Sequence, residues 1–209
     1  VYMKIQHDGS VVNRDQSVTA VSMFTYTRPS IASFLPLNGP TVGGGSLTIQ
    51  GSNFGADPSV ISVFLGSTRC GTLTVSSSGD TIKCTVASGS GAGHSILVAV
   101  DGQNAQSVMD TFKYNGPLIT AISPVNGPTS GAFTMIIRGS NFGTASADAQ
   151  VSFVLASRRS SGNSGLSVVQ ITDASVSFIV PANVGSDVEI SVTVKSQIGL
   201  LQAGAFIYD

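Results

Sequence analysis

Charged residues are scarce in this sequence, since Lys, Arg, Asp and Glu together make up only 10% of its 209 residues. The ten Lys and Arg are scattered and are opposed by eleven Asp and Glu, which leaves a formal net charge of -1. A surface that binds the phosphates of DNA or RNA needs clustered basic side chains. The sequence therefore predicts no nucleic-acid partner.

Long apolar segments are also missing. No uninterrupted apolar run approaches the roughly 20 residues that a bilayer-spanning helix needs. We expect no membrane insertion by this segment. The chain opens on Val1 without a charged and apolar leader, so we expect a mature or excised piece of a longer protein.

Groups suited to catalysis are few. The two histidines, His7 and His94, stand in no pattern that pairs a base with a nucleophilic serine. The glycine-rich residues 42–46 are not followed by the Lys-Ser or Lys-Thr pair of a phosphate-binding loop. Acidic residues lie mostly singly in or near expected turns, where turn hydrogen bonding and solvation account for them: Asp57, Asp80, Asp101, Asp110, Asp148, Asp173, Asp187 and Glu189. We expect no catalytic residue, no cofactor, no metal site and no enzyme activity.

What the sequence does contain is an internal repeat. The segment Gly-Ser-Asn-Phe-Gly occupies residues 51–55 and recurs letter for letter at residues 139–143, 88 residues later. Farther along the chain the matching apolar segments are 94 residues apart, so the second copy carries extra residues. These fall near residues 157–165, which read as a lengthened surface loop.

The ends of the copies repeat as well, and they set the expected boundaries. The pattern Phe-x-Tyr at residues 112–114 recurs at residues 206–208 and precedes the first copy at residues 24–26. We therefore predict two modules, residues 29–116 and residues 117–209. Residues 1–28 are interpreted as the closing strands of a preceding or partner-completed module.

Apolar residues within each copy alternate with polar ones, as in Ile96-x-Val98-x-Val100. This spacing is typical of half-buried strands. Turn residues separate the strands at short intervals, which favours a sandwich of two antiparallel sheets. We predict an all-β fold of tandem immunoglobulin-like sandwiches. Phe54 and Phe142 are expected to fill the cores, with Gly55 and Gly143 at positive φ.

A spaced pattern in both copies resembles a known family. It reads Ile31-x-x-Phe34-x-Pro36-x-x-Gly39-Pro40 and Leu47-x-Ile49-x-Gly51-x-x-Phe54 in the first copy, and Ile119-x-x-Ile122-x-Pro124-x-x-Gly127-Pro128 and Ile137-x-Gly139-x-x-Phe142 in the second. This pattern is similar to the IPT/TIG modules of plexins, growth-factor receptors, ciliate and algal surface proteins and some transcription factors. The resemblance covers residues 29–209 and implies the fold more strongly than the function.

The only two cysteines are Cys70 and Cys84. In extracellular relatives this region often carries a disulfide between neighbouring strands, so the resemblance implies that Cys70 and Cys84 are bonded. Two free buried thiols are the alternative. The second copy has Phe178 at the position of Cys84. Zinc binding is not expected, because no histidine accompanies the pair.

Two surface features are left open. Arg158 and Arg159, in the lengthened loop, either contact an acidic partner or a sugar sulfate or simply face solvent. No Asn-x-Ser or Asn-x-Thr triplet occurs, so N-glycosylation is not expected. Serine-rich stretches such as residues 76–78 and 157–167 either carry O-linked glycans or form plain solvated loops.

These observations favour a non-enzymatic extracellular or cell-surface repeat protein with a structural or adhesive role, rod-like or filament-forming. Its partners would be neighbouring modules or copies of the same protein, with residues 1–28 completing a neighbouring sandwich by strand complementation. The alternative is the stalk of a plexin-like receptor ectodomain. Pro29 and Pro117 follow closing strands directly, so we expect short linkers and a restricted angle between modules.

Overall fold

The computed structural model describes residues 4–5, 11–12, 26–106, 110–143, 149–155, 163–166, 168–186, 188–201 and 204–209. These residues form strands and turns, and their one helical segment is the short 3-10 helix η1 (Pro58–Val60). No helix in this described part of the chain is long and apolar enough to cross a bilayer.

The first module is a sandwich of two four-stranded sheets. One sheet has the order β3-β5-β9-β8 and the other the order β11-β10-β6-β7, and the pairs within them are antiparallel. Its strands are β3 (Ser30–Leu35), β4 (Asn38–Gly39), β5 (Ser46–Ser52), β6 (Ile61–Leu65), β7 (Thr68–Arg69), β8 (Leu73–Val75), β9 (Thr81–Thr85), β10 (Ile96–Val100), β11 (Gln103–Gln106) and β12 (Lys113–Tyr114).

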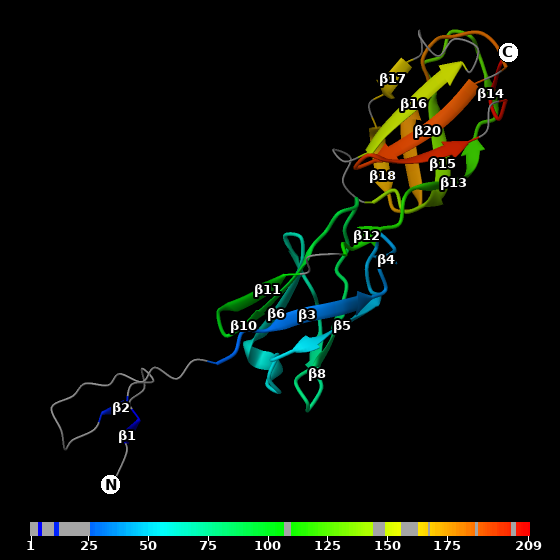
Figure 1. Ribbon diagram of the computed structural model, residues 1–209. Helices are drawn as coiled ribbons and strands as arrows, with labels where there is room; N and C mark the ends of the chain where they lie inside the picture. The colour runs from blue at the N-terminus through cyan, green and yellow to red at the C-terminus, as the bar shows by residue number, and fades with distance from the viewer. Residues whose placement is uncertain are drawn as a thin grey trace.

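The second module repeats this plan, with the sheets β13-β15-β19-β18 and β17-β16-β20-β21. Its strands are β13 (Leu118–Ser123), β14 (Asn126–Gly127), β15 (Thr134–Ser140), β16 (Ala149–Leu155), β17 (Asn163–Leu166), β18 (Val168–Thr172), β19 (Ser175–Ile179), β20 (Val188–Val194), β21 (Gln197–Leu201) and β22 (Ile207–Tyr208). The two sandwiches lie end to end, with β4 and β12 of the first module facing the second (Figure 1).

The alternating apolar residues account for both cores. Along β20 every second side chain is buried, from Val188 to Val194, and β6 alternates in the same way. The buried apolar residues form two separate clusters, one within each module. Each module therefore has its own core, and the prediction of an all-β tandem of immunoglobulin-like sandwiches is confirmed.

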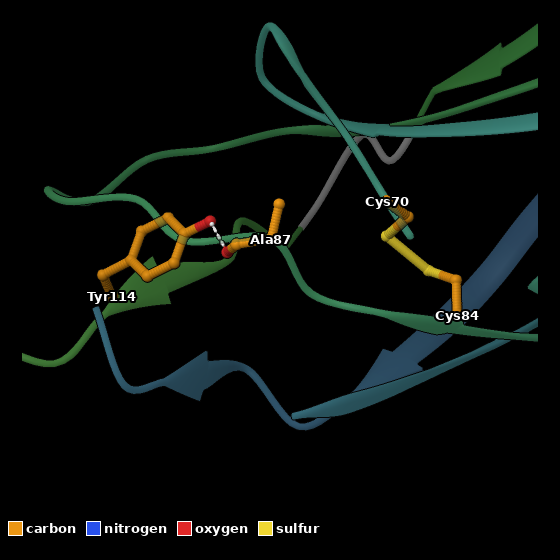
Figure 2. Close-up of a disulfide and its surroundings, with 4 residues drawn as sticks. All are labelled: Cys70, Cys84, Ala87 and Tyr114. Carbon is orange, nitrogen blue, oxygen red and sulfur yellow. Dashed lines mark hydrogen bonds between the residues drawn. A yellow bond between two sulfur atoms is a disulfide. The ribbon is translucent and has the colours of Figure 1, made fainter. Parts of the chain in front are cut away.

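Each module is closed by a short parallel pair, β12 with β4 and β22 with β14. Tyr114 ends the first closing strand, and its hydroxyl donates to the Ala87 carbonyl oxygen at 2.9 Å, as Figure 2 shows. Tyr208 repeats the arrangement with the Pro181 carbonyl oxygen at 2.7 Å. The repeated Phe-x-Tyr pattern thus ties the end of each module back to its own sandwich.

Burial raises the pKa of the Tyr208 hydroxyl from 10.0 to about 12 and raises that of Tyr114 as well. Because the folded pKa lies above the unfolded one, this contribution to stability is complete below pH 10. It is lost as the pH rises from about 10 to about 12. We expect the melting temperature of the second module to fall across this window. Melts of Tyr208→Phe at pH 8, 10 and 12 should show a smaller alkaline decrease, and an equal decrease would contradict the assignment.

The repeated Gly-Ser-Asn-Phe-Gly segments make matching turns. Phe54 and Phe142 are fully buried, and Gly55 and Gly143 adopt φ of 72° and 74°, as expected. The sequence did not predict that the preceding Asn53 and Asn141 also have positive φ, 61° and 60°. Asparagine tolerates this left-handed region better than most residues do. The peptide bonds before Pro36 and Pro124 are cis in both copies.

Of residues 1–28, the structure describes 4–5, 11–12 and 26–28. Strands β1 (Lys4–Ile5) and β2 (Val11–Val12) pair in antiparallel fashion. Their assignment to a preceding or partner-completed module stays a prediction.

Candidate functional site

The two modules meet at a joint built around Thr41, in the turn that follows β4. Thr41 is only 3% exposed and is the one buried polar residue in the described part of the chain. Its hydroxyl donates to Asp173 Oδ1 and lies 3.5 Å from Asn141 Oδ1, and its backbone N–H lies 3.4 Å from the same oxygen. A buried hydroxyl is costly unless it is paired, and here both acceptors belong to the second module.

The second module presents these acceptors from two turns. Asn141 belongs to the turn after β15, where positive φ sets the direction of its side chain, and Asp173 belongs to the turn between β18 and β19. The Gly143 N–H donates to the same Asp173 Oδ1 at 3.1 Å and so helps to hold the carboxylate where Thr41 contacts it. Hydrogen bonds to a charged acceptor are stronger than neutral ones, so Asp173 is the main acceptor of the joint.

A second contact joins the modules through the connecting segment. Gln197, at the start of β21, donates from Nε2 to the Tyr114 carbonyl oxygen at 2.8 Å. A side chain at Gly116 would lie 3.5 Å from the Gln197 Cβ, so the connector rests on this glutamine. One at Gly91 would come within 3.0 Å of the Lys195 Cβ. The two modules thus approach each other closely at Gly91 and at Gly116.

The sequence motifs do not predict this contact between the modules. The sequence assigns Asp173 to turn hydrogen bonding and solvation, which is incomplete, because its carboxylate also accepts from the Thr41 hydroxyl of the other module. Nothing in the spacing of Thr41, Asn141 and Asp173 indicates that they meet. A hint did exist: the repeat implies end-to-end modules, and the end turns of one must then contact the next.

The disulfide lies inside the first module. Cys70 follows β7 and Cys84 lies in β9, so the bond joins the two sheets and not neighbouring strands of one sheet (Figure 2). Their Cα atoms are 5.9 Å apart, a separation that suits a disulfide. At the position of Cys84 the second module buries Phe178 completely, so an aromatic ring fills the equivalent space.

The other residues singled out from the sequence make local contacts or lie outside the described residues. Asp57 caps η1 by accepting from the Ser59 N–H, and Asp80 accepts from Ser76, so these two acids do serve turns. These hydrogen bonds lower the pKa of both carboxyls. Within the described ranges, no group of three or more His, Cys, Asp or Glu could hold a metal ion. Arg158 and Arg159 lie outside the described residues.

The model of the IPT/TIG domain matches this chain twice, at residues 29–114 and 117–208. The chain belongs to the IPT/TIG domain family. The resemblance predicted from the spaced motifs is thereby confirmed, and the two matches coincide with the two sandwiches.

Several solved structures are similar to parts of this chain. The surface glycan-binding protein PbSGBP-B from Prevotella bryantii is 10% identical with a TM-score of 0.53, over 85% of this chain and 42% of that one. The plexin A4 extracellular region is 19% identical with a TM-score of 0.41, over 95% of this chain and 20% of that one. SGBP-B from Bacteroides uniformis is 18% identical with a TM-score of 0.34, over 86% of this chain and 50% of that one. The IPT/TIG tandem thus spans only a part of the proteins that it matches.

Proposed function

We propose that this IPT/TIG tandem is a stiff, non-enzymatic spacer in an extracellular or cell-surface repeat protein with a structural or adhesive role. The observation that carries the proposal is the burial of Thr41 between the modules, with its hydroxyl on Asp173. A joint that buries and pairs a polar side chain has a preferred geometry, because any rotation would leave the hydroxyl without an acceptor. The axis of the two sandwiches would then persist through the joint.

The connecting segment supports the same conclusion. Only three residues separate β12, which ends at Tyr114, from β13, which begins at Leu118. One of the three, Pro117, has a restricted backbone, and the Tyr114 carbonyl before them is held by Gln197. So short a connector leaves little room for independent motion.

An extracellular location is supported by the Cys70–Cys84 disulfide, which persists in oxidising compartments. The absence of an activity of its own is proposed because the polar groups at the joint are engaged in contacts between modules. Asp173 accepts from Thr41 and Gly143, and Gln197 donates to Tyr114. These side chains hold the two modules together.

Residues 1–28 are proposed to complete a third sandwich. Both described modules already contain their own closing strands, β10–β12 in the first and β20–β22 in the second. In the described part of the chain, each module is thus closed by strands of its own sequence. The sandwich completed by these residues would therefore be a neighbouring module, which would extend the rod at its N-terminal end.

The orientation of the two modules tests the spacer function. Residual dipolar couplings measured on the whole chain should give one alignment tensor for both modules. Thr41→Ala removes the buried hydroxyl, should weaken the joint by about 1–2 kcal/mol, and should separate the two tensors. The matched control is Thr129→Ala, because Thr129 is the equivalent residue at the far end of the second module and is exposed. Independent tensors in the unsubstituted chain would rule out the stiff spacer.

A further inference from the structure

The N-terminal end of the first module carries an open groove of about 660 Å³. Its lining comes from the turn after β5, from the β10–β11 turn and from the segment before β3, namely Tyr26, Thr27, Pro29, Asn53, Gly55, Val100, Asp101 and Gln103. These are the same parts of the fold that, in the second module, form the joint with the first.

The equivalence holds residue by residue. Asn53 and Gly55 correspond to Asn141 and Gly143, and Gln103 corresponds to Gln197. Tyr26 and Pro29 likewise correspond to Tyr114 and Pro117. The groove therefore contains an asparagine at the position of the acceptor Asn141 and a glutamine at the position of the donor Gln197. It also contains the counterpart of the segment that connects the two modules.

Gln103 and Gln197 are both partly buried, but at three other corresponding positions burial is greater in the second module. Gly55 is exposed whereas Gly143 is buried, and Val100 is partly exposed whereas Val194 is 1% exposed. Asn53 is exposed, while Asn141 is partly buried. At Gly143 the first module contributes to the cover, since a Cβ there would lie 3.9 Å from the Ser90 Cβ, whereas Val194 packs in the core of its own module. The surface around Asn53 thus corresponds to the joint surface of the second module. No sandwich among the described residues covers it.

The connector indicates where the cover belongs. Tyr26 and Pro29 line the groove, and Asn53 Nδ2 donates to the Arg28 carbonyl oxygen at 3.1 Å. The chain thus enters the first module along the groove, just as residues 114–117 pass along Gln197. A sandwich whose closing strand ends at Tyr26 would arrive at the groove with its end turns facing Asn53.

We propose that this groove is a docking site for the end of another IPT/TIG sandwich, the one whose closing strand leads into Tyr26. It would present a hydroxyl side chain, placed as Thr41 is, to Asn53 Oδ1. This inference rests on the proposed spacer function and adds a specific docking surface to it. One part of the joint is altered: Gly79 stands at the position of Asp173, so the charged acceptor is lost and the new joint is the weaker of the two.

A disulfide trap tests the docking. In the described joint a Cβ at Gly143 lies 3.9 Å from the Ser90 Cβ, within the range for a disulfide, so the two-module variant Ser90→Cys/Gly143→Cys should cross-link. The positive φ of Gly55 and Gly143 strains a cysteine at either position, so the two traps are compared under the same strain. For the groove, residues 29–114 are placed before Thr27 in place of residues 1–26. Each module has its own core, so the added copy can fold. Ser90→Cys in the added copy is paired with Gly55→Cys in the original module. The matched control pairs Ser90→Cys with Val184→Cys at the far end of the second module.

Peptide mapping without reductant is expected to find the Ser90–Gly55 cross-link in the three-module chain and none in the control. In the same chain without cysteine substitutions, amide exchange at residues 53–55 and 100–103 should slow at least several-fold relative to the native chain. A Ser90–Gly143 cross-link without a Ser90–Gly55 cross-link, and with unchanged exchange, would overturn the docking site and leave the spacer function intact. Absence of the Ser90–Gly143 cross-link from the folded two-module variant Ser90→Cys/Gly143→Cys would overturn both.

Discussion

Replacing Gly51 with alanine is expected to destabilise the first module by about 3 kcal/mol or more. A Cβ at this position would overlap the Ser30 carbonyl oxygen and lie 2.5 Å from Cζ of the buried Phe54 ring. To make room for this Cβ, the backbone of β3 and the buried Phe54 ring would both have to shift, and a closely packed core resists such shifts. Gly139→Ala should do the same to the second module, since its Cβ would overlap the Leu118 carbonyl oxygen and lie 2.6 Å from Phe142 Cζ.

The control is Gly45→Ala, just before β5. A Cβ there meets no atom within 4 Å, so the change should alter stability by less than about 1 kcal/mol. Differential scanning calorimetry of the whole chain separates the effects, because each module has its own core and should keep its own transition. If Gly51→Ala and Gly45→Ala melted alike, the close approach of β3 and β5 would not be a determinant of stability.

Removing the disulfide should have an effect of similar size. The double variant Cys70→Ala/Cys84→Ala is expected to lose about 3 kcal/mol in the first module, because a bridge closing a loop of this length restricts the unfolded chain by roughly that amount. The transition of the second module, which has Phe178 in the corresponding place, should not move.

Reductant provides the control for this variant. Dithiothreitol should lower the first transition of the native chain once the bond is opened, and it should have no effect on the double variant. Two free thiols in the untreated native chain, measured by mass spectrometry after alkylation, would show instead that the cysteines are merely buried neighbours.

The sandwich fold could be predicted because its signals are local and doubled. Alternation such as that of β20 specifies a half-buried strand without reference to the rest of the chain, and the second copy of each motif confirms the first. The Phe-x-Tyr ends marked the closing strands for the same reason. The turns at Gly55 and Gly143 likewise follow from the local Asn-Phe-Gly sequence.

The joint could not be predicted in this way. Thr41 and Asp173 lie 132 residues apart, and each belongs to a polar turn of ordinary composition. Their contact depends on the direction in which one sandwich leaves the other, which is set by the connector and by the packing of Gly91 against Lys195. The disulfide illustrates the same limit. The family resemblance implies the bond, but only the placement of β7 and β9 in different sheets reveals that it links one sheet to the other.

The parallel closing pairs have a mechanical consequence. In the first module β12 runs parallel to β4, with Lys113 N–H on the Leu37 carbonyl at 3.0 Å and Asn115 N–H on the Gly39 carbonyl at 2.7 Å. When a chain is stretched from its ends, two parallel strands of this kind are drawn in opposite directions along their length. Their hydrogen bonds then bear the load together, and do not open one after another as in a zipper. The β14–β22 pair repeats this arrangement, so each module of the tandem resists tension through its own pair of parallel strands.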